Sequence, residues 1–570
     1  MALRRWLDRH ALALLAAATS AVLAVVFYYP VAIVFAESGG LSAFADVLSD
    51  EFLVREILGF TAYQAALSTL ASVALGLPGA YVLSRYEFPG RRTLRSLTIL
   101  PFVMPSILVV IGFVAFFGEQ GLLNDLLGLV GLSIGELLRG LPVDSLLYNL
   151  PAIIVAHAFY NAPLVARVTN AAWESVDARE VETARSLGAG RFRAFVDVLA
   201  PQLLPAVLTG ALLAFIFTFM SFPIVLELGG LGYATVEVWI YGLVRDLDYS
   251  AAATLAVMET ALSLALTYAY LRYEARQASA SRAARPPARK RLLPDDPSPR
   301  AVLERVGVGA YGLVVVVVFG GPLVSTVLES VTGPNGFTLR YYEFLVQRQT
   351  TGASFQTKPG VAVWNSLAFG VGTLLAAVPM GVVVAALANR ARSRWGRAVE
   401  ALAMAPFAVS GVMVGLGMLR GLVFGVPLPV VGRVQVDGAL AIVAAHAVAA
   451  YPFVVRSVGP MLGNVDRRTV ESARALGATR FRALLDVELP LVAAGVVAGA
   501  AFAFAISIGE FDSTVILATG SSSYTMPVAV ERYLGNRTLG PATAMGSVLL
   551  VVTAASFVVV DRLGGRWEYG

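Results

Sequence analysis

Cysteine is absent from this chain of 570 residues, and histidine occurs only three times. These absences exclude disulfides and thiolate metal sites, and they leave too few ligands for a histidine-rich metal site. Lysine is confined to Lys290 and Lys358, and neither follows a glycine. The phosphate-binding loop of nucleotide hydrolases requires Gly-Lys followed by Ser or Thr. We therefore expect no cofactor and no enzyme activity, ATP hydrolysis included.

Charge is also scarce, because 14% of the residues are charged whereas 57% are hydrophobic, with a mean hydropathy of +0.73. A soluble chain of this length needs more charge to cover its surface. Recurring apolar runs of about twenty residues predict an all-α, polytopic membrane protein that contacts the lipid bilayer and no nucleic acid. A signal peptide is the alternative for the first run, but its length favours an uncleaved helix. We expect about twelve transmembrane helices, at 11–36, 59–84, 96–118, 148–172, 202–228, 250–272, 302–328, 361–388, 399–421, 438–463, 491–517 and 541–562.

Arginines gather in alternate loops between these spans, whereas the opposite loops carry mainly acids and isolated arginines. Positively charged residues favour the cytoplasmic side of a membrane. We therefore expect a protein of the cell membrane with both termini in the cytoplasm. The arginine-rich loops hold Arg85, Arg91, Arg92 and Arg95; Arg179, Arg185, Arg191 and Arg193; Arg390, Arg392, Arg394 and Arg397; and Arg467, Arg468, Arg474, Arg480 and Arg482.

The chain contains an internal repeat. His446 lies 289 residues after His157, and Pro452 lies 289 residues after Pro163. Each half has six expected spans, so both halves begin on the same side of the membrane and are parallel repeats. A basic, proline-rich segment joins them and is expected to be a disordered cytoplasmic tether. The expected boundaries are 1–272 for the N-terminal half (core 59–272), 273–300 for the linker and 301–570 for the C-terminal half (core 361–562).

Each half also contains a short polar segment on the expected cytoplasmic side. Asp177 is expected to cap a helix in a box with Glu180, and Gly188 to end that helix. A second short helix follows, which makes a helix–glycine–helix projection that we call a knob. The two copies share one spacing, with Glu182, Ala184, Gly188, Val198 and Pro201 in the first and Glu471, Ala473, Gly477, Val487 and Pro490 in the second.

This spacing resembles the cytoplasmic loop of binding-protein-dependent ABC importer permeases. The resemblance implies a type I (MetI-like) transmembrane domain in a fused, two-domain form, most similar to thiamine and ferric-iron permeases. It further implies an ATPase partner, expected as a homodimer, a binding protein outside the membrane, and a coupling role for both knobs. The implied ATPase-docking residues are Glu182, Ala184, Gly188, Glu471, Ala473 and Gly477.

Two alternatives accompany this interpretation. The pairs Glu182–Arg185 and Glu471–Arg474 have the spacing of ion pairs that merely support a surface helix. A twelve-helix secondary transporter of the facilitator type is the rival class, because arginine-rich loops also follow the second and eighth expected spans. Such a transporter has no need of two knobs.

The solute path is predicted from ionisable residues within the expected spans, where charge is costly and indicates function. His157 and His446 occupy matching spans, and a hydrogen bond between helices is the alternative role for each. Glu510 and Asp512 lie near the outer end of the eleventh span and fit a polar entrance. The sequence leaves the solute open among thiamine, ferric iron and another small polar compound.

Overall fold

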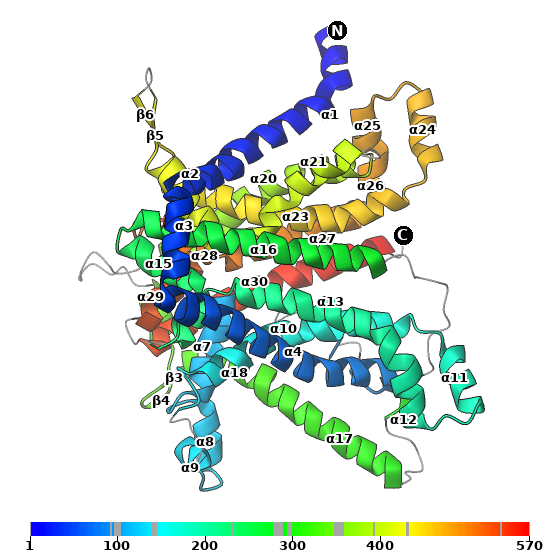
Figure 1. The fold of residues 1–570 in the computed structure, drawn as a ribbon, viewed down its shortest axis with the longest axis vertical. Coiled ribbons are helices and arrows are strands. Elements are labelled where there is room, and N and C mark those ends of the chain that lie inside the picture. The colour runs from blue at the N-terminus through cyan, green and yellow to red at the C-terminus, as the bar shows by residue number, and fades with distance from the viewer. Residues whose placement is uncertain are drawn as a thin grey trace. The chain divides into compact units, whose positions relative to one another are not determined.

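The computed structural model describes residues 2–568 apart from 92–93, 96–103, 140–144, 230–231, 278–288, 293–298, 347–357, 391–393, 429–431 and 536–537. The described chain forms two compact units (Figure 1). Unit 1 comprises 1–46, 240–260 and 330–570, and unit 2 comprises 47–239 and 261–329. Arg92 and most of the expected linker lie outside the described residues.

The first half is helical from its first described residue. Its elements are α1 (Ala2–Leu23), η1 (Ala24–Tyr28), α2 (Tyr29–Glu37), α3 (Gly40–Ser49), η2 (Leu53–Gly59), α4 (Phe60–Arg85), β1 (Tyr86–Glu87), α7 (Ser106–Phe117), α8 (Leu122–Gly128), α9 (Ile134–Leu138), α10 (Leu150–Glu174), α11 (Ala178–Ser186), α12 (Arg191–Ala194), η3 (Phe195–Leu199), α13 (Ala200–Phe219), α14 (Pro223–Leu228), α15 (Val236–Arg245) and α16 (Tyr249–Gln277).

The second half begins after the short strand β2 (Lys290–Arg291) and follows the same order. Its elements are α17 (Pro299–Val315), η5 (Val316–Gly320), α18 (Gly321–Ser330), β3 (Thr332–Gly333), β4 (Gly336–Phe337), α19 (Arg340–Val346), α20 (Pro359–Ala388), α21 (Arg394–Met404), η6 (Ala405–Ala408), α22 (Gly411–Met418), η7 (Leu419–Val423), β5 (Val426–Leu428), β6 (Gly432–Val434), α23 (Gly438–Asn464), α24 (Arg467–Ala475), α25 (Arg480–Ala483), η8 (Leu484–Glu488), α26 (Leu489–Leu491), α27 (Ala493–Gly509), α28 (Asp512–Leu517), α29 (Met526–Gly535) and α30 (Leu539–Glu568).

The predicted all-α membrane architecture is confirmed. Ten helices among the described residues are long and apolar enough to cross a membrane, and two bent helix pairs raise the number to twelve. The bent pairs are Val399–Ala408 with Gly411–Val423, at 98°, and Arg480–Leu491 with Ala493–Gly509, at 84°. The ninth predicted span is therefore bent, whereas the second bend lies at the start of the eleventh predicted span, between Leu491 and Ala493.

The predicted fifth and eleventh spans also end too late. α13 stops at Phe219, and Pro223 starts the separate helix α14. α27 stops at Gly509, where the Glu510 carboxylate accepts hydrogen bonds from the backbone amides of Ser513 and Thr514 at 2.8 and 3.2 Å. A proline start in one half and a carboxylate cap in the other each begin a new helix. Hydropathy alone does not detect either break.

The two units repeat the same helix packing. Val165 of α10 lies between two glycines of unit 2. A Cβ added at Gly76 would lie 3.1 Å from the Val165 Cβ, and a Cβ added at Gly210 would lie 3.2 Å from the Val165 Cα. In unit 1, Val454 of α23 has the same position between Gly381 and Gly499, with corresponding distances of 2.5 and 3.0 Å. Small residues let membrane helices approach closely. The three-dimensional packing therefore matches the sequence repeat.

Each unit also contains a helix from the other half of the sequence. The arm α1–α2 belongs to unit 1, where the Tyr28 hydroxyl donates to the Leu402 carbonyl at 2.7 Å. The arm α17–α18 belongs to unit 2, where the Tyr311 hydroxyl donates to the Leu75 carbonyl at 2.8 Å and Phe319 stacks on Phe159. The compact units are therefore not the same segments as the sequence halves.

Candidate functional sites

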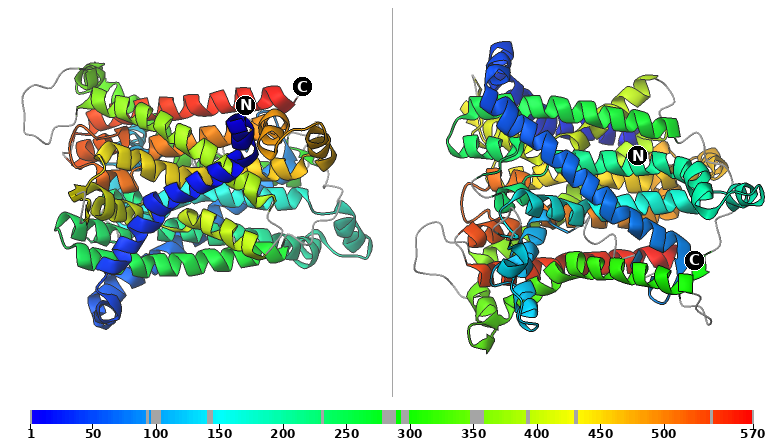
Figure 2. Two further views of the ribbon diagram at one scale, coloured as in Figure 1. Left: turned by 90° about the horizontal axis from the view of Figure 1, so that it is seen from above. Right: turned by 60° about the horizontal axis from the view of Figure 1, so that its bottom comes forward.

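The first knob has the helix–glycine–helix geometry predicted for it. Asp177 caps α11 by accepting from the Arg179 amide at 3.0 Å, whereas Glu180 bonds Gln202 at 2.8 Å and forms no capping box. Gly188 ends α11 with φ +90°, and its amide donates to the Arg185 carbonyl at 3.1 Å. This left-handed conformation favours glycine. The chain then continues into α12 and η3, and the knob extends beyond the N-terminal end of α13 (Figures 1 and 2).

The second knob repeats this geometry in unit 1. Asp466 caps α24 by accepting from the Arg468 amide at 2.9 Å, and Gly477 ends it with φ +96°. The Gly477 amide donates to the Arg474 carbonyl at 3.0 Å. α25 and η8 follow and lead into α26, and α24 and α25 extend past the end of α23 (Figure 1). The same backbone conformation therefore recurs at two places in the chain.

The knob surfaces are exposed and carry apolar side chains. Leu187 is 83% exposed, Phe192 79% and Leu476 91%. Glu182 and Glu471 are exposed, and among the described residues neither carboxylate has an ion-pair or hydrogen-bond partner. The alternative that these glutamates pair with Arg185 and Arg474 to support their helices therefore gains no support. Exposed apolar groups beside unpaired carboxylates are typical of a protein interface.

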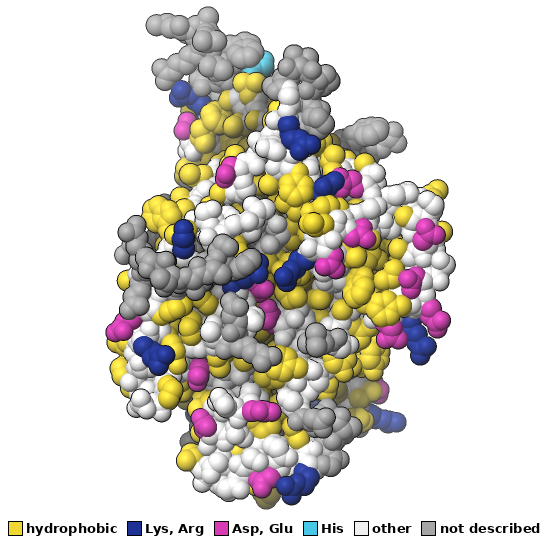
Figure 3. Space-filling model, turned by 90° about the vertical axis from the view of Figure 1, so that its left-hand side faces the viewer, with side chains coloured by type: hydrophobic (Ala, Val, Ile, Leu, Met, Phe, Trp, Pro, Cys, Tyr) yellow, Lys and Arg dark blue, Asp and Glu magenta, His cyan; other side chains and the backbone are white. Residues whose placement is uncertain are grey.

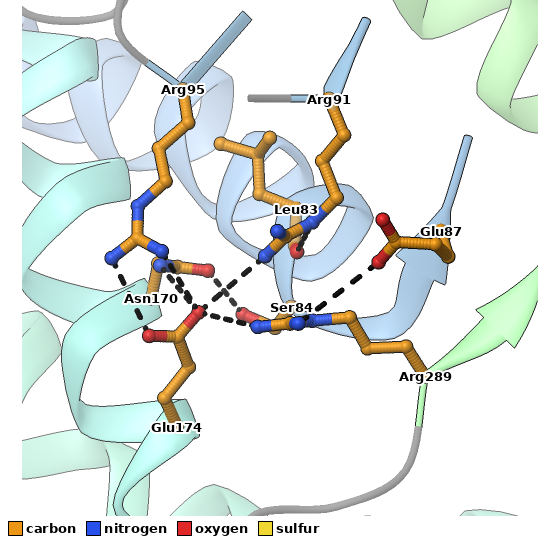
Figure 4. A network of polar contacts seen from close by, with 8 residues as sticks. All are labelled: Leu83, Ser84, Glu87, Arg91, Arg95, Asn170, Glu174 and Arg289. Carbon is orange, nitrogen blue, oxygen red and sulfur yellow. Dashed lines mark hydrogen bonds and ion pairs between the residues drawn. The ribbon is translucent and has the colours of Figure 1, made fainter. Parts of the chain in front are cut away.

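Behind the first knob, one carboxylate gathers three arginines (Figure 4). Glu174, at the end of α10, lies 2.9 Å from Arg289, 3.4 Å from Arg95 and 3.5 Å from Arg91. Arg91 is buried and also donates to the Leu83 carbonyl at 2.8 Å. Burial lowers the pKa of the Arg91 guanidinium, and the charge of Arg289 lowers it further. The sequence pattern did not identify Glu174, although an acid at the end of a predicted span is the signal for it.

Part of the predicted linker takes part in this network. Lys290 and Arg291 form the strand β2, which pairs in parallel with β1, and the Leu292 amide donates to the Glu87 carbonyl at 3.1 Å. Arg289 reaches Glu174 and lies 4.0 Å from the Glu87 carboxylate. The expectation of a disordered tether is therefore wrong for residues 289–292, because backbone pairing and ion pairs hold them to unit 2.

The second knob has a different support. Glu488, in η8, accepts two hydrogen bonds of 2.8 Å from Arg390 at the end of α20. Its carboxylate side chain is 10% exposed. Both bonds come from one guanidinium nitrogen of Arg390, so the pair is charge-assisted but lacks the parallel two-nitrogen geometry. A cavity of about 520 Å³ opens beside this pair, between the ends of α20 and α23 and the knob.

His157 and His446 are buried at equivalent positions and join helices within their own units. In unit 2, His157 lies 3.2 Å from the Ser68 hydroxyl and 2.9 Å from the Ser221 hydroxyl. In unit 1, His446 lies 2.8 Å from both the Ser507 and the Thr514 hydroxyls. Both ring nitrogens of each histidine are engaged, as expected for a buried group that links helices.

The two predicted acids of the solute path have separate surroundings. The Glu510 carboxylate lies 3.0 Å from His446 Nε2, in addition to capping α28. Asp512 begins α28 and faces the start of α22, because a Cβ added at Gly411 would lie 2.7 Å from the Asp512 Cβ. Glu510 is therefore tied to His446, and Asp512 packs beside α22.

The face drawn in Figure 3 carries acidic and basic side chains among apolar ones. Among the described residues, no group of three or more His, Asp or Glu side chains is placed to hold a metal ion. The candidate functional sites that the structure describes are consequently the two knobs and the polar contacts behind them.

Comparison with known proteins identifies the family to which this chain of two helical repeats belongs. Residues 72–278 and 377–569 match the family "Binding-protein-dependent transport system inner membrane component". The chain belongs to this family and is a multi-pass permease component of an ABC importer. This membership disfavours the facilitator-type alternative.

Named relatives cover nearly the whole chain. It is 26% identical over 527 residues to the thiamine transport system permease protein ThiP of Escherichia coli (strain K12), covering 91% of each chain. It is 30% identical over 257 residues to the putative 2-aminoethylphosphonate transport system permease protein PhnU of Salmonella paratyphi A, covering 44% of this chain and 86% of that one. The structure of a bacterial ABC transporter involved in alginate import matches 47% of this chain, at 17% identity and a TM-score of 0.40.

Proposed function

We propose that the two knobs are coupling elements that dock into a separate ATPase, and that the chain imports a small polar solute when that ATPase closes. The observation that carries this proposal is the duplication of one exposed surface. Gly188 and Gly477 impose the same turn, and beside each an exposed leucine and an unpaired glutamate face solvent. Two equal sites suit a partner that presents two equal grooves, as a homodimer does.

The docking residues are the six predicted from the repeat. Glu182 and Glu471 offer free carboxylates, and Ala184 and Ala473 are half-buried small residues that permit close approach. Gly188 and Gly477 set the angle between the two helices of each knob. Closure of the ATPase moves both knobs, and the attached helices α10 and α23 carry that movement into the membrane.

Thiamine is the proposed solute, delivered by a binding protein outside the membrane. The likeness to thiamine permeases along 91% of the chain supports it over ferric iron, and the 2-aminoethylphosphonate permease matches less than half of the chain. His157, His446, Glu510 and Asp512 are proposed to shape the outer part of the path. The His446–Glu510 contact holds the break between α27 and α28, and Asp512 offers a carboxylate to a cationic solute such as thiamine.

Reconstitution tests this function. The permease is combined in proteoliposomes with a candidate ATPase and a candidate binding protein, and uptake of labelled thiamine is compared with uptake of ferric iron. We expect ATP-dependent thiamine uptake that requires the binding protein. Uptake without ATPase, or driven by an ion gradient alone, would contradict the proposal.

Orientation needs a separate test. Reporter fusions after Arg272 and at the C-terminus should both report a cytoplasmic location, because arginine-rich loops favour that side of the membrane. Both knobs then lie on the side where the ATPase acts. A periplasmic reading at either fusion point would remove the knobs from their proposed partner.

A further inference from the structure

The cavity behind the second knob is distinct from the proposed solute path, and it shares Glu471 with the proposed docking surface. Its volume is about 520 Å³, within the range typical of small-molecule sites. Buried side chains of Leu462, Ala483 and Glu488 contribute to its wall, so it enters the fold instead of lying flat on it. All of its lining residues belong to unit 1.

The charge of this cavity is predominantly positive. Arg467, Arg474 and Arg480 line it, are exposed, and have no carboxylate partner among the described residues. Arg390 also lines it but is neutralised by Glu488. Glu471 is the remaining acid of the lining, so the three free arginines exceed the free carboxylates.

Two backbone carbonyls near the cavity already accept hydrogen bonds from side chains. They therefore do not present free negative ends to an anion. Arg390 donates to the Ala386 carbonyl at 2.9 Å, and Asn389 donates to the Gly459 carbonyl at 2.9 Å. These bonds satisfy carbonyls at the negative ends of α20 and α23.

The first half differs at this place. Gly463 is equivalent to Glu174, whose carboxylate gathers three arginines behind the first knob. Those three arginines are not the equivalents of the three that line the cavity, and the equivalent of Arg467 is Ala178. The second half therefore has free arginines beside a cavity, and a glycine where the first half has a carboxylate.

We propose that this cavity binds a phosphate-bearing anion, with Arg467, Arg474 and Arg480 as its ligands. Guanidinium groups match phosphate oxygens in geometry and charge, and three of them suit a diphosphate better than a single phosphate. The anion comes either from a soluble diphosphate compound or from an anionic lipid headgroup. Since α24 and α25 contribute ligands and α23 forms the facing wall, a bound anion joins the knob to its supporting helix and restrains it.

Binding of inorganic pyrophosphate to the purified permease in neutral detergent tests this proposal without any transport assay. We expect saturable binding in isothermal titration calorimetry that is tighter than binding of inorganic phosphate. Arg480→Gln should weaken it about tenfold, the effect of removing one charged hydrogen bond. Arg468→Gln, on the same knob but outside the cavity, should leave it unchanged and serves as the matched control.

Gly463→Glu is the decisive variant, because it introduces the carboxylate that the first half carries. A Cβ at this position would meet only the Asn389 side-chain oxygen, at 3.4 Å, so the substitution fits the backbone. We expect it to abolish pyrophosphate binding while the thermal unfolding temperature stays close to that of the parent. Binding that persists in Gly463→Glu, or that is unaffected by Arg480→Gln, would overturn the proposal.

Two further measurements identify the source of the anion. Permease in phosphatidylcholine nanodiscs should bind pyrophosphate, and adding phosphatidylglycerol should compete with it if the natural ligand is a lipid headgroup. Pyrophosphate binding that phosphatidylglycerol leaves unchanged would identify a soluble diphosphate as the natural ligand. If binding disappears when the ATPase is added, the ATPase covers the arginines, and the cavity is not an anion site of the assembled transporter.

Discussion

The two knobs share their backbone but not their support. Gly188 and Gly477 have φ values of +90° and +96° and make equivalent hydrogen bonds. Behind the first knob Glu174 gathers arginines from the α4 region and the linker, whereas behind the second Glu488 pairs with Arg390 beside an open cavity. Under the proposed function a common partner would constrain the exposed turn, whereas the contacts behind the turn differ between the two knobs.

The same contrast extends into the membrane. Ser221 and Glu510 occupy equivalent positions, and each contacts the histidine of its own unit. The second half therefore holds a carboxylate where the first has a hydroxyl. Packing of Val165 and Val454 between glycines is nevertheless the same in both units. Helix packing is conserved between the repeats, and polar contacts differ.

The largest expected effect comes from the glycines that the knobs share. Gly188→Val and Gly477→Val each place a β-branched residue in a left-handed conformation, which costs roughly 1–2 kcal/mol locally. We expect either change alone to abolish uptake and to lower retention of the ATPase during purification, while the permease still accumulates in the membrane. Because both knobs move together, one altered knob should disable the whole transporter.

Asparagine is the matched control for these glycines, because it tolerates the left-handed region far better than valine. Gly188→Asn and Gly477→Asn should retain a measurable part of the uptake. Equal loss in the asparagine and valine variants would indicate that the side chain blocks the contact and that the turn geometry is not the cause.

The histidines offer the next test of the comparison. His446→Leu removes one partner from Glu510, Ser507 and Thr514, each of which keeps another hydrogen bond, to the Ser513 amide, to Thr373 and to Glu510 respectively. His157→Leu removes the contact that the His157 ring makes with the Ser68 and Ser221 hydroxyls. Each buried polar group left unsatisfied costs about 1–3 kcal/mol, so thermal stability in detergent should fall for both leucine variants. The glutamine variants should remain near the parent stability. If glutamine preserves stability but impairs uptake, the histidines act on the solute or its gate.

Removing the supporting carboxylates has a smaller expected effect. Glu488→Gln leaves Arg390 with a neutral partner, and Glu174→Gln leaves three arginines close together. We expect about 1–2 kcal/mol of destabilisation for each, because both sites are partly exposed. Exchange of the pair, Arg390→Glu with Glu488→Arg, should restore part of the loss. An exchange that is no better than the single change would indicate that packing, and not charge, supports the second knob.

The smallest effect is expected at the linker. Arg289 is partly exposed, so Arg289→Ala should cost less than about 1 kcal/mol. It should nevertheless increase the rate of protease cleavage near residues 289–292 by releasing them from β1. The neighbouring Arg291→Ala keeps the contact to Glu174 and serves as control.

Much of this molecule follows from the sequence, because its main features are periodic or duplicated. Hydropathy predicts the spans, and the constant separation of the two knob motifs predicts both repeats and both glycine turns. Non-local contacts were not predicted. Nothing in the pattern indicated that α1–α2 belongs to unit 1, that Glu174 gathers three arginines, or that Glu510 breaks the eleventh span. Each of these depends on side chains from segments far apart in the chain.

The absence of cysteine makes one measurement especially direct. Ala184→Cys and Ala473→Cys each introduce the sole thiol of the permease, and a short bifunctional reagent is applied to membranes that contain the assembled transporter. Both variants should cross-link to the ATPase, whereas Ser42→Cys, exposed on α3, should not. The account predicts two equivalent cross-links, one from each knob. Absence of both, with the complex intact, would contradict the claim that these knobs are the coupling elements.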